Sequence, residues 1–152
     1  MTLKDQLNED LKTAMRSGDE TRKSVIRLLR SAILNAEKSG TQKPIELDND
    51  GVITVLSRQA KQRRDSIEAF AQGGRQDLVH QEEAELEIIT EYLPKQMTEK
   101  EIRSLATNAI KDIAASGPEE MGKIMGSLMP KIKGKVDGKI VREIVTDLLE
   151  SL

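Results

Sequence analysis

Apolar residues recur every three or four positions along nearly the whole chain, and this spacing is the strongest constraint on the fold. It places apolar side chains on one face of an α-helix, whereas a half-buried strand alternates apolar and polar residues. The first segment shows the pattern with Leu3, Leu7, Leu11 and Met15. No alternation of useful length with strand-forming residues is present. The sequence therefore predicts an all-α fold.

Seven helices are predicted, and residues that favour helix starts and stops bound most of them. The expected ranges are 3–16, 20–39, 51–72, 76–93, 99–115, 118–129 and 137–152. Predicted N-caps are Thr2, Asp19 and Asp137, and Thr98 is predicted to form a capping box with Glu101. Residue 40 is a glycine and is expected to end the second helix, with a loop over residues 40–50.

The segment from Pro94 to Met97 is the best candidate for a domain boundary. A proline disfavours helical backbone in the residue before it, and a new helix start follows at Thr98. With 152 residues the chain is long enough for one domain or two small ones. We therefore expect an N-terminal four-helix unit (residues 1–95) followed by a C-terminal three-helix bundle (residues 96–152).

Composition excludes several classes of protein. The chain has no cysteine, which excludes disulfides, thiolate nucleophiles and cysteine-ligated metals. No apolar run approaches membrane-spanning length, and residues 1–16 lack the apolar region of a signal peptide. These features favour a cytoplasmic protein with no membrane partner. The net charge is only -2, so any electrostatic function must come from local patches.

The residues that most resemble a catalytic or metal site do not form one. The single histidine, His80, has Glu83 one helical turn away, but a transition metal normally needs three or four converging ligands. Asp48 and Asp50 resemble the start of a calcium loop, yet the required acid would fall at Ser57. No serine or threonine has a histidine partner at a catalytic spacing, and glycine-rich phosphate motifs are missing. We expect no catalytic residues, no metal and no cofactor.

A basic segment covers residues 121–142, where six cations and one acid give a local charge of about +5. The cations are Lys123, Lys131, Lys133, Lys135, Lys139 and Arg142. Three of the lysines follow Pro130 in a connection where Gly134 and Gly138 are expected to leave the backbone free and exposed. Lysines on such a loop can follow a phosphate backbone as adjustable point charges. A solubilising lysine loop explains the same pattern equally well.

Two glycines, Gly122 and Gly126, interrupt the helix that precedes this connection. Each costs about 1 kcal/mol relative to alanine in a helix. We therefore expect another group to approach the backbone closely there, a neighbouring helix more than a ligand. The methionines Met121, Met125 and Met129 beside them are spaced as a core-facing stripe.

A second basic set lies in the N-terminal half. Lys23, Arg27 and Arg30 share one face of the second helix, next to its apolar stripe. Arg63 projects along the apolar side of the third helix, where pairing with an acid or burial of its aliphatic stem is the simplest explanation. A partner-binding role for these residues is the minority interpretation.

Three segments carry a resemblance to a known family. They are the pattern Asp19...Arg22...Ile26-Arg27-Leu28-Leu29...Ala32-Ile33...Glu37, the junction Glu91-Tyr92-Leu93-Pro94-Lys95-Gln96, and Met121-Gly122-Lys123-Ile124-Met125-Gly126 followed by Lys135-Val136-Asp137-Gly138-Lys139-Ile140-Val141. With them the chain resembles the GatB/YqeY family along essentially its whole length, specifically a stand-alone YqeY-type protein.

The resemblance implies that the C-terminal unit is similar to the tail domain of the B subunit of glutamine-dependent tRNA amidotransferases, which contacts tRNA. The larger B-subunit domain that performs the chemistry is missing. The resemblance thus favours a non-catalytic tRNA-binding or tRNA-associated accessory protein, with tRNA, a tRNA amidotransferase or the aminoacyl-tRNA machinery as partners. A protein–protein adaptor is the alternative. Carbon–nitrogen ligase activity with glutamine as amido-N-donor is a distant third, since only the family label suggests it.

Overall fold

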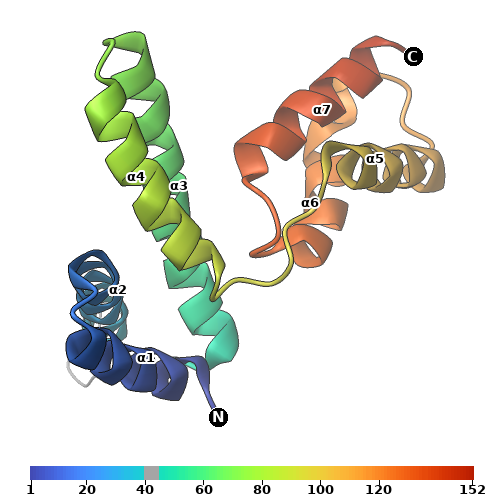
Figure 1. Ribbon diagram of the computed structural model, residues 1–152. Coiled ribbons are helices and arrows are strands. Elements are labelled where there is room, and N and C mark those ends of the chain that lie inside the picture. The colour runs from blue at the N-terminus through green and yellow to red at the C-terminus, as the bar shows by residue number, and fades with distance from the viewer. Residues whose placement is uncertain (40–44) are drawn as a thin grey trace. The chain divides into compact units, whose positions relative to one another are not determined.

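The computed structural model describes residues 1–39 and 45–152, and over these residues it contains helices and no strands. Figure 1 shows them in chain order: α1 (Leu3–Ser17), α2 (Glu20–Lys38), α3 (Asn49–Gln72), α4 (Gln76–Thr90), α5 (Glu99–Ile113), the short 3-10 helix η1 (Pro118–Glu120), α6 (Met121–Ile132) and α7 (Gly138–Glu150). The predicted all-α fold is confirmed. The helix stop predicted at residue 40 lies outside the described residues.

The predicted N-caps are confirmed by hydrogen bonds from first-turn backbone amides to the capping side chains. Thr2 accepts from Asp5 at 3.1 Å, and Asp19 accepts from Arg22 at 3.0 Å. The other two are a bond from Glu101 to Thr98 at 3.2 Å and one from Lys139 to Asp137 at 3.0 Å. These side chains satisfy amides that have no partner within the helix, so they fix where each helix begins.

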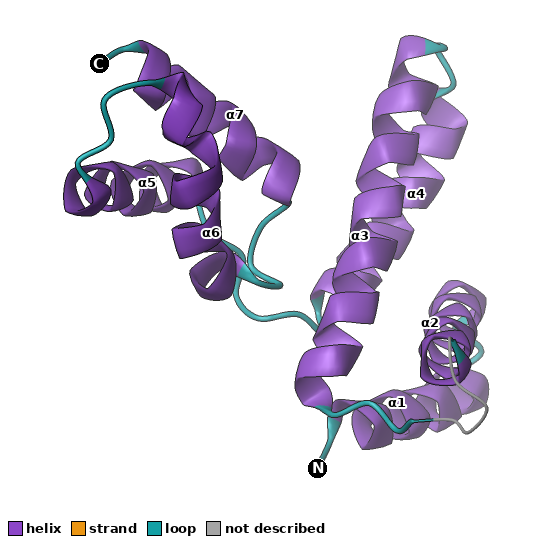
Figure 2. Ribbon diagram, turned by 180° about the vertical axis from the view of Figure 1, so that it is seen from behind, coloured by secondary structure: helices purple, strands orange, loops and turns teal. Residues whose placement is uncertain are grey.

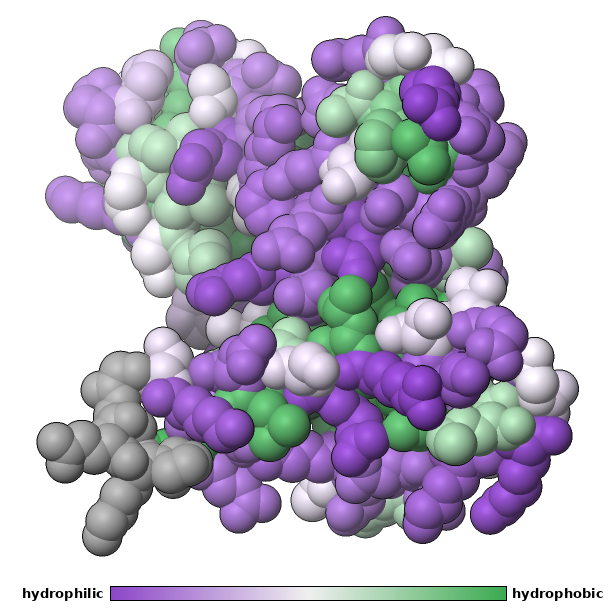
Figure 3. All heavy atoms as spheres, turned by 90° about the vertical axis from the view of Figure 1, so that its left-hand side faces the viewer, coloured by the Kyte–Doolittle hydropathy of each residue, from purple (hydrophilic) through white to green (hydrophobic). Residues whose placement is uncertain are grey.

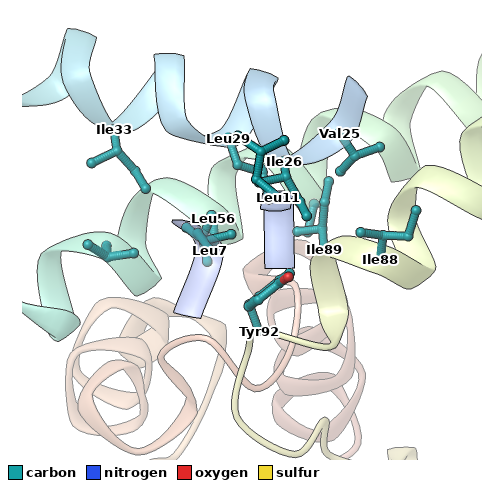
Figure 4. Packing of buried hydrophobic residues seen from close by; sticks show 12 residues of the cluster. Leu7, Leu11, Val25, Ile26, Leu29, Ile33, Leu56, Ile88, Ile89 and Tyr92 are labelled. Atoms are coloured by element: carbon teal, nitrogen blue, oxygen red, sulfur yellow. The ribbon is translucent and has the colours of Figure 1, made fainter. Parts of the chain in front are cut away.

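The chain divides into two compact units, and the first covers Met1–Pro94. Within it, α3 and α4 form a long antiparallel hairpin that turns at Gly73 and Gly74, and α1 pairs with α2 (Figures 1 and 2). All four helices bury apolar side chains in one cluster. Figure 4 shows Leu7 and Leu11 of α1, Ile26 and Leu29 of α2, Leu56 of α3 and Ile89 of α4 meeting in this cluster.

Two polar links tie the end of α4 to the helices at the start of the chain. Tyr92 is buried, and its hydroxyl donates to the Asp10 carboxylate of α1. Arg22 of α2 donates to both carboxylate oxygens of Glu91, at 2.6 and 3.2 Å. The pKa of Arg22 is raised, chiefly by this hydrogen-bonded carboxylate. Together the two links hold α1, α2 and α4 at one end of the unit.

Arg63 confirms the pairing expected for a cation on an apolar helix side. Its Nε lies 3.3 Å from Glu85 Oε2 and 3.6 Å from Glu82 Oε2, and its side chain is only 12% exposed. Burial, followed by the neighbouring Glu85 charge, raises the pKa of Glu82. This ion-pair group joins α3 to α4, so it belongs to the structure of the hairpin.

The second unit covers Lys95–Leu152, and each of α5, α6 and α7 packs against the other two. Its core contains Ile102, Ile110, Ile124, Leu128 and Val145, all at most 7% exposed. The predicted methionine stripe is right for two of its three members, since Met121 and Met125 pack against this core. Met129 does not, because it points outward and is 49% exposed.

Helix α6 runs through Pro130 and ends at Ile132, three residues beyond the predicted stop at Met129. A proline inside a helix removes one backbone hydrogen bond, here the one to the carbonyl of Gly126. Both Pro130 and Gly126 lie on the exposed side, where water can satisfy that carbonyl. The buried Ile132 next to them explains why the helix continues.

Candidate nucleic-acid interface

The connection between α6 and α7 opens with a tight, well-defined turn. Lys133 has φ −54° and ψ 121°, Gly134 has φ 75°, and the Lys135 amide donates to the Ile132 carbonyl at 2.9 Å. These values match a type II β-turn, which needs glycine at its third position. The expectation that Gly134 leaves the backbone free and exposed is wrong, because Gly134 is buried and its conformation is fixed.

A second segment of the chain, distant in sequence, is hydrogen-bonded to this turn. The connector that enters α5 runs beside the turn in both ribbon views (Figures 1 and 2). The Gln96 side-chain amide donates to the Gly134 carbonyl at 2.8 Å, and the Met97 backbone amide donates to the Lys135 carbonyl at 2.8 Å. The carbonyls of Ile132, Gly134 and Lys135 therefore have protein partners, which makes the turn rigid.

Five of the six predicted cations lie in this turn or in the helix ends on either side of it. Lys131 lies in the last turn of α6, Lys133 and Lys135 lie in the type II turn, and Lys139 and Arg142 lie in the first turns of α7. All five are exposed. Among the described residues, no carboxylate lies within ion-pair distance of Lys131, Lys133, Lys135 or Arg142. Their charges remain available to an external anion.

Lys123 is not part of this group. It lies in the first turn of α6, eight residues before Lys131, which places it about 12 Å away along the helix axis. It is exposed, so it can extend a basic track along α6, but it does not belong to the turn itself.

The helix dipoles add to the charge distribution. Cations at the C-terminal end of α6 offset the partial negative charge of that end. At the start of α7, Lys139 and Arg142 add positive charge where the dipole is already positive, and the Asp137 carboxylate that caps the helix offsets part of it.

The close approach expected at Gly122 and Gly126 is corrected by the space around these positions. A Cβ placed on Gly122, Gly126 or Gly138 would meet no atom within 4 Å. No part of the described chain approaches these backbones closely, so helix packing does not explain them. Gly122 and Gly126 instead leave a smooth exposed edge on α6 next to Lys123.

Two residues next to the turn, Lys95 and Gln96, were not predicted from the sequence as neighbours of the lysines. Lys95 is exposed, has no ion-pair partner among the described residues, and comes directly before Gln96, which bonds to the turn. Its distance in sequence from the other lysines hides this neighbourhood. A capping box at Thr98 after an extended Pro94 indicates the connector, but nothing local indicates what it contacts.

One of the three cations predicted on the basic face of α2 is paired with an acid. Lys23 lies 2.9 Å from Glu20, whereas Arg27 and Arg30 are exposed and have no carboxylate partner among the described residues. Leu28 and Leu34 beside them are 43% and 51% exposed. Figure 3 looks onto the side of Figure 1 where α2 lies and shows apolar patches between hydrophilic side chains.

Among the described residues, no group of three or more His, Asp or Glu side chains is arranged to hold a metal ion. No helix in this part of the chain is both long and apolar enough to cross a membrane.

Comparison with known proteins finds one family and several curated relatives similar to this chain. The family described as Yqey-like protein matches residues 4–149. Curated relatives carry the name "Altered inheritance of mitochondria protein 41, mitochondrial". The one from Lachancea thermotolerans is 40% identical over 114 residues, which cover 74% of this chain and 60% of the relative. The one from Pyrenophora tritici-repentis is 34% identical over 125 residues, which cover 79% of this chain and 67% of the relative.

These comparisons correct one expectation. The cytoplasmic location expected from composition is contradicted, because the relatives are named as mitochondrial proteins. The absence of cysteine and of a long apolar run limits redox chemistry and membrane insertion, and neither property distinguishes one aqueous compartment from another. The chain spans about three fifths of the length of the Lachancea relative, and the matched segment of the Eremothecium gossypii relative is 46% of that protein.

Proposed function

The chain belongs to the Yqey-like protein family, and from this premise we propose that it is a non-catalytic tRNA-binding accessory protein that holds the phosphate backbone on the turn between α6 and α7. One observation carries the proposal. Exposed cations lie in and next to a rigid turn, and Lys131, Lys133, Lys135 and Arg142 have no carboxylate within ion-pair distance among the described residues. A merely solubilising loop does not need such a fixed backbone.

Recognition would be through phosphates and shape. Proteins that read unpaired bases usually stack them on aromatic side chains. Residues 95–152 contain no aromatic residue and no histidine, and the buried Tyr92 of the first unit is bonded to Asp10. Lysines supply charge without base-specific geometry, so binding should be strong in low salt and show little sequence preference.

The decisive variant reverses three charges at the turn, Lys131→Glu, Lys133→Glu and Lys135→Glu together. We expect filter binding of bulk tRNA to the full chain to be abolished at moderate salt, because each lost phosphate contact removes counterion release. A control triple reverses exposed lysines elsewhere, Lys12→Glu, Lys38→Glu and Lys111→Glu. It produces the same net charge and should retain most of the binding. Equal losses in both triples, or unchanged binding in the first, would refute the proposal.

A second candidate function is supported by α2. Its outward face combines the exposed Leu28 and Leu34 with the unpaired Arg27 and Arg30, a mixture that suits an acidic amphipathic segment of a partner protein. An adaptor of this kind would retain a defined protein after nuclease treatment. Arg27→Glu with Leu34→Ser should release that protein, while the lysine triple at the α6–α7 turn should not.

Carbon–nitrogen ligase activity remains the third candidate and has no supporting site among the described residues. Glutamine-dependent amidation of misacylated tRNA by the purified chain would make ligase activity the leading candidate function.

A further inference from the structure

We propose that the connector Lys95–Met97 is a working part of the RNA-binding site, with Lys95 as a phosphate contact and Gln96 as the residue that positions the turn lysines. This inference rests on the proposed function, because it adds residues to the same surface. Both roles follow from the contacts between the connector and the α6–α7 turn.

Two hydrogen bonds hold the connector at a fixed spacing from the α6–α7 turn. Gln96 Nε2 lies 2.8 Å from the Gly134 carbonyl, and the Met97 amide lies 2.8 Å from the Lys135 carbonyl. The two bonds join consecutive residues of the connector to consecutive residues of the turn. The two segments are therefore held in register, although 38 positions separate Gln96 from Gly134 in sequence.

Lys95 lies close to the lysines of the α6–α7 turn. Its Cα lies two residues from that of Met97, which is about 7 Å at most. An extended lysine side chain can therefore reach the same phosphate group as Lys133 or Lys135. Lys95 is exposed, and the nearest acids in sequence are already paired, Glu91 with Arg22 and Glu99 with Arg103. The acids four positions to either side of Lys95 are therefore engaged with other cations.

Gln96 carries no charge. Its side-chain amide donates to the carbonyl of Gly134, which is a buried residue. A buried carbonyl without a hydrogen-bond partner lowers the free energy of unfolding. Without this bond the turn would relax to bring the carbonyl to water. Lys133 and Lys135 flank Gly134 on either side, so their directions depend on its conformation. Gln96 thus acts on binding through the lysines.

The test for Lys95 measures tRNA binding by the full chain across a salt series. Lys95→Glu should weaken binding as much as Lys133→Glu does, and should reduce the slope of log K against log salt by about 0.7 to 0.9 for one lost phosphate contact. Lys111→Glu is the matched control, since it makes the same charge change at an exposed site near the end of α5. Its slope should equal that of the wild type.

The test for Gln96 uses Gln96→Met, which keeps the side-chain length and the net charge but removes the donor. We expect this variant to bind tRNA more weakly. We also expect that Lys133→Glu weakens tRNA binding by a smaller factor in the Gln96→Met chain than in the wild-type chain. This non-additivity distinguishes positioning from a general loss of stability, because only a residue that acts through Lys133 couples to it. If the variant fails to fold, the Lys95→Glu measurement still decides the inference.

The outcomes separate this inference from the proposed function. Wild-type binding by both Lys95→Glu and Gln96→Met, combined with loss of binding in the lysine triple, would overturn the connector's role and leave the RNA site standing. Wild-type binding by the lysine triple would overturn both. Additive effects of Gln96→Met and Lys133→Glu would remove the positioning role alone.

Discussion

Glycine has two unrelated roles in the second unit, and the difference lies in backbone conformation. Gly134 has φ 75° inside a type II turn, a region that costs other residues about 1–2 kcal/mol. Gly126 lies in ordinary helix, and a Cβ there would meet no atom within 4 Å. The fold therefore requires the first glycine and tolerates replacement of the second.

Alanine substitutions should separate these two roles. Gly126→Ala should raise the free energy of unfolding by roughly 0.5–1 kcal/mol, because alanine loses less backbone entropy in a helix. Gly134→Ala should lower it by about 1 kcal/mol or more, because alanine resists positive φ. Urea unfolding followed by circular dichroism of the full chain measures both. A destabilising Gly126→Ala would show that the helix edge is not open.

Glu37 is a buried carboxylate whose partners come from two distant segments. It accepts from the Lys4 ammonium of α1 and from the Leu47 backbone amide, the latter at 2.8 Å. The Lys4 hydrogen bond, followed by the bond from Leu47, holds its pKa below the ordinary value of 4.5. Because the pKa is lower in the folded state, this carboxylate contributes stability above its unfolded pKa and loses that contribution as pH falls through the folded value.

Replacing the carboxylate should therefore change the pH dependence of unfolding. Glu37→Gln should be less stable than the wild type at pH 7, and the difference in stability should narrow as the pH falls below the ordinary pKa of 4.5, because the unfolded wild-type chain then binds a proton more readily than the folded one. Urea unfolding at pH 7, 5 and 3 checks this. A gap that stays constant over that range would show that the charge of Glu37 does not stabilise the fold.

At the scale of the helices, sequence predicted most starts and fewer ends. A start depends on a local side-chain bond, and Thr2, Asp19, Thr98 and Asp137 all accept a bond from a first-turn amide. For the capping box predicted at Thr98, this is the bond from the Glu101 amide to the Thr98 hydroxyl. An end depends more on tertiary packing. Helix α6 passes through Pro130 because Ile132 is buried in the core, which the local sequence does not reveal.

The candidate site was predicted in part for the same reason. Charge density along the chain indicated the lysines around the turn, since that signal is local. The register between the connector and the turn depends on contacts 38 residues apart, so Lys95 and Gln96 were missed. Gly122 and Gly126 were interpreted wrongly. The low helix propensity of glycine suggests that another group offsets the lost stability, but it does not show whether that group belongs to this chain.

The junction of α1, α2 and α4 depends on the Tyr92 hydroxyl. Burial, followed by the hydrogen bond to Asp10, raises the pKa of Tyr92, so the hydroxyl stays protonated and donates. Tyr92→Phe keeps the ring in the core and removes only this bond. Hydrogen bonds to charged groups contribute about 1.5–3 kcal/mol, so we expect a loss of that order in thermal unfolding.

A matched control exists on the same hairpin. Thr54 donates its hydroxyl to the Asp50 carbonyl in an exposed turn of α3, so Thr54→Val removes a hydroxyl without touching the junction. Its cost should be well below that of Tyr92→Phe. Equal costs would mean that the Tyr92–Asp10 bond contributes nothing special to holding the helices together.

On the scale of the whole molecule, the chain has two hydrophobic cores with no shared residue. One cluster draws on α1 to α4 and includes Leu29, which is fully buried. The other draws on α5 to α7 and includes Leu128, which is 1% exposed. Because cooperativity follows shared packing, each unit should unfold as its own cooperative group.

Core substitutions in the full chain test this division. Leu128→Ala should cost about 2–5 kcal/mol through the lost burial and the cavity left behind. Hydrogen exchange read by mass spectrometry should then become faster in peptides from residues 99–150 and stay unchanged in peptides from residues 3–38 and 49–90. Leu29→Ala should produce the reverse pattern. If either substitution accelerated exchange throughout the chain, the two cores would form one cooperative structure, and the proposed RNA site could not be stabilised or weakened independently of the N-terminal unit.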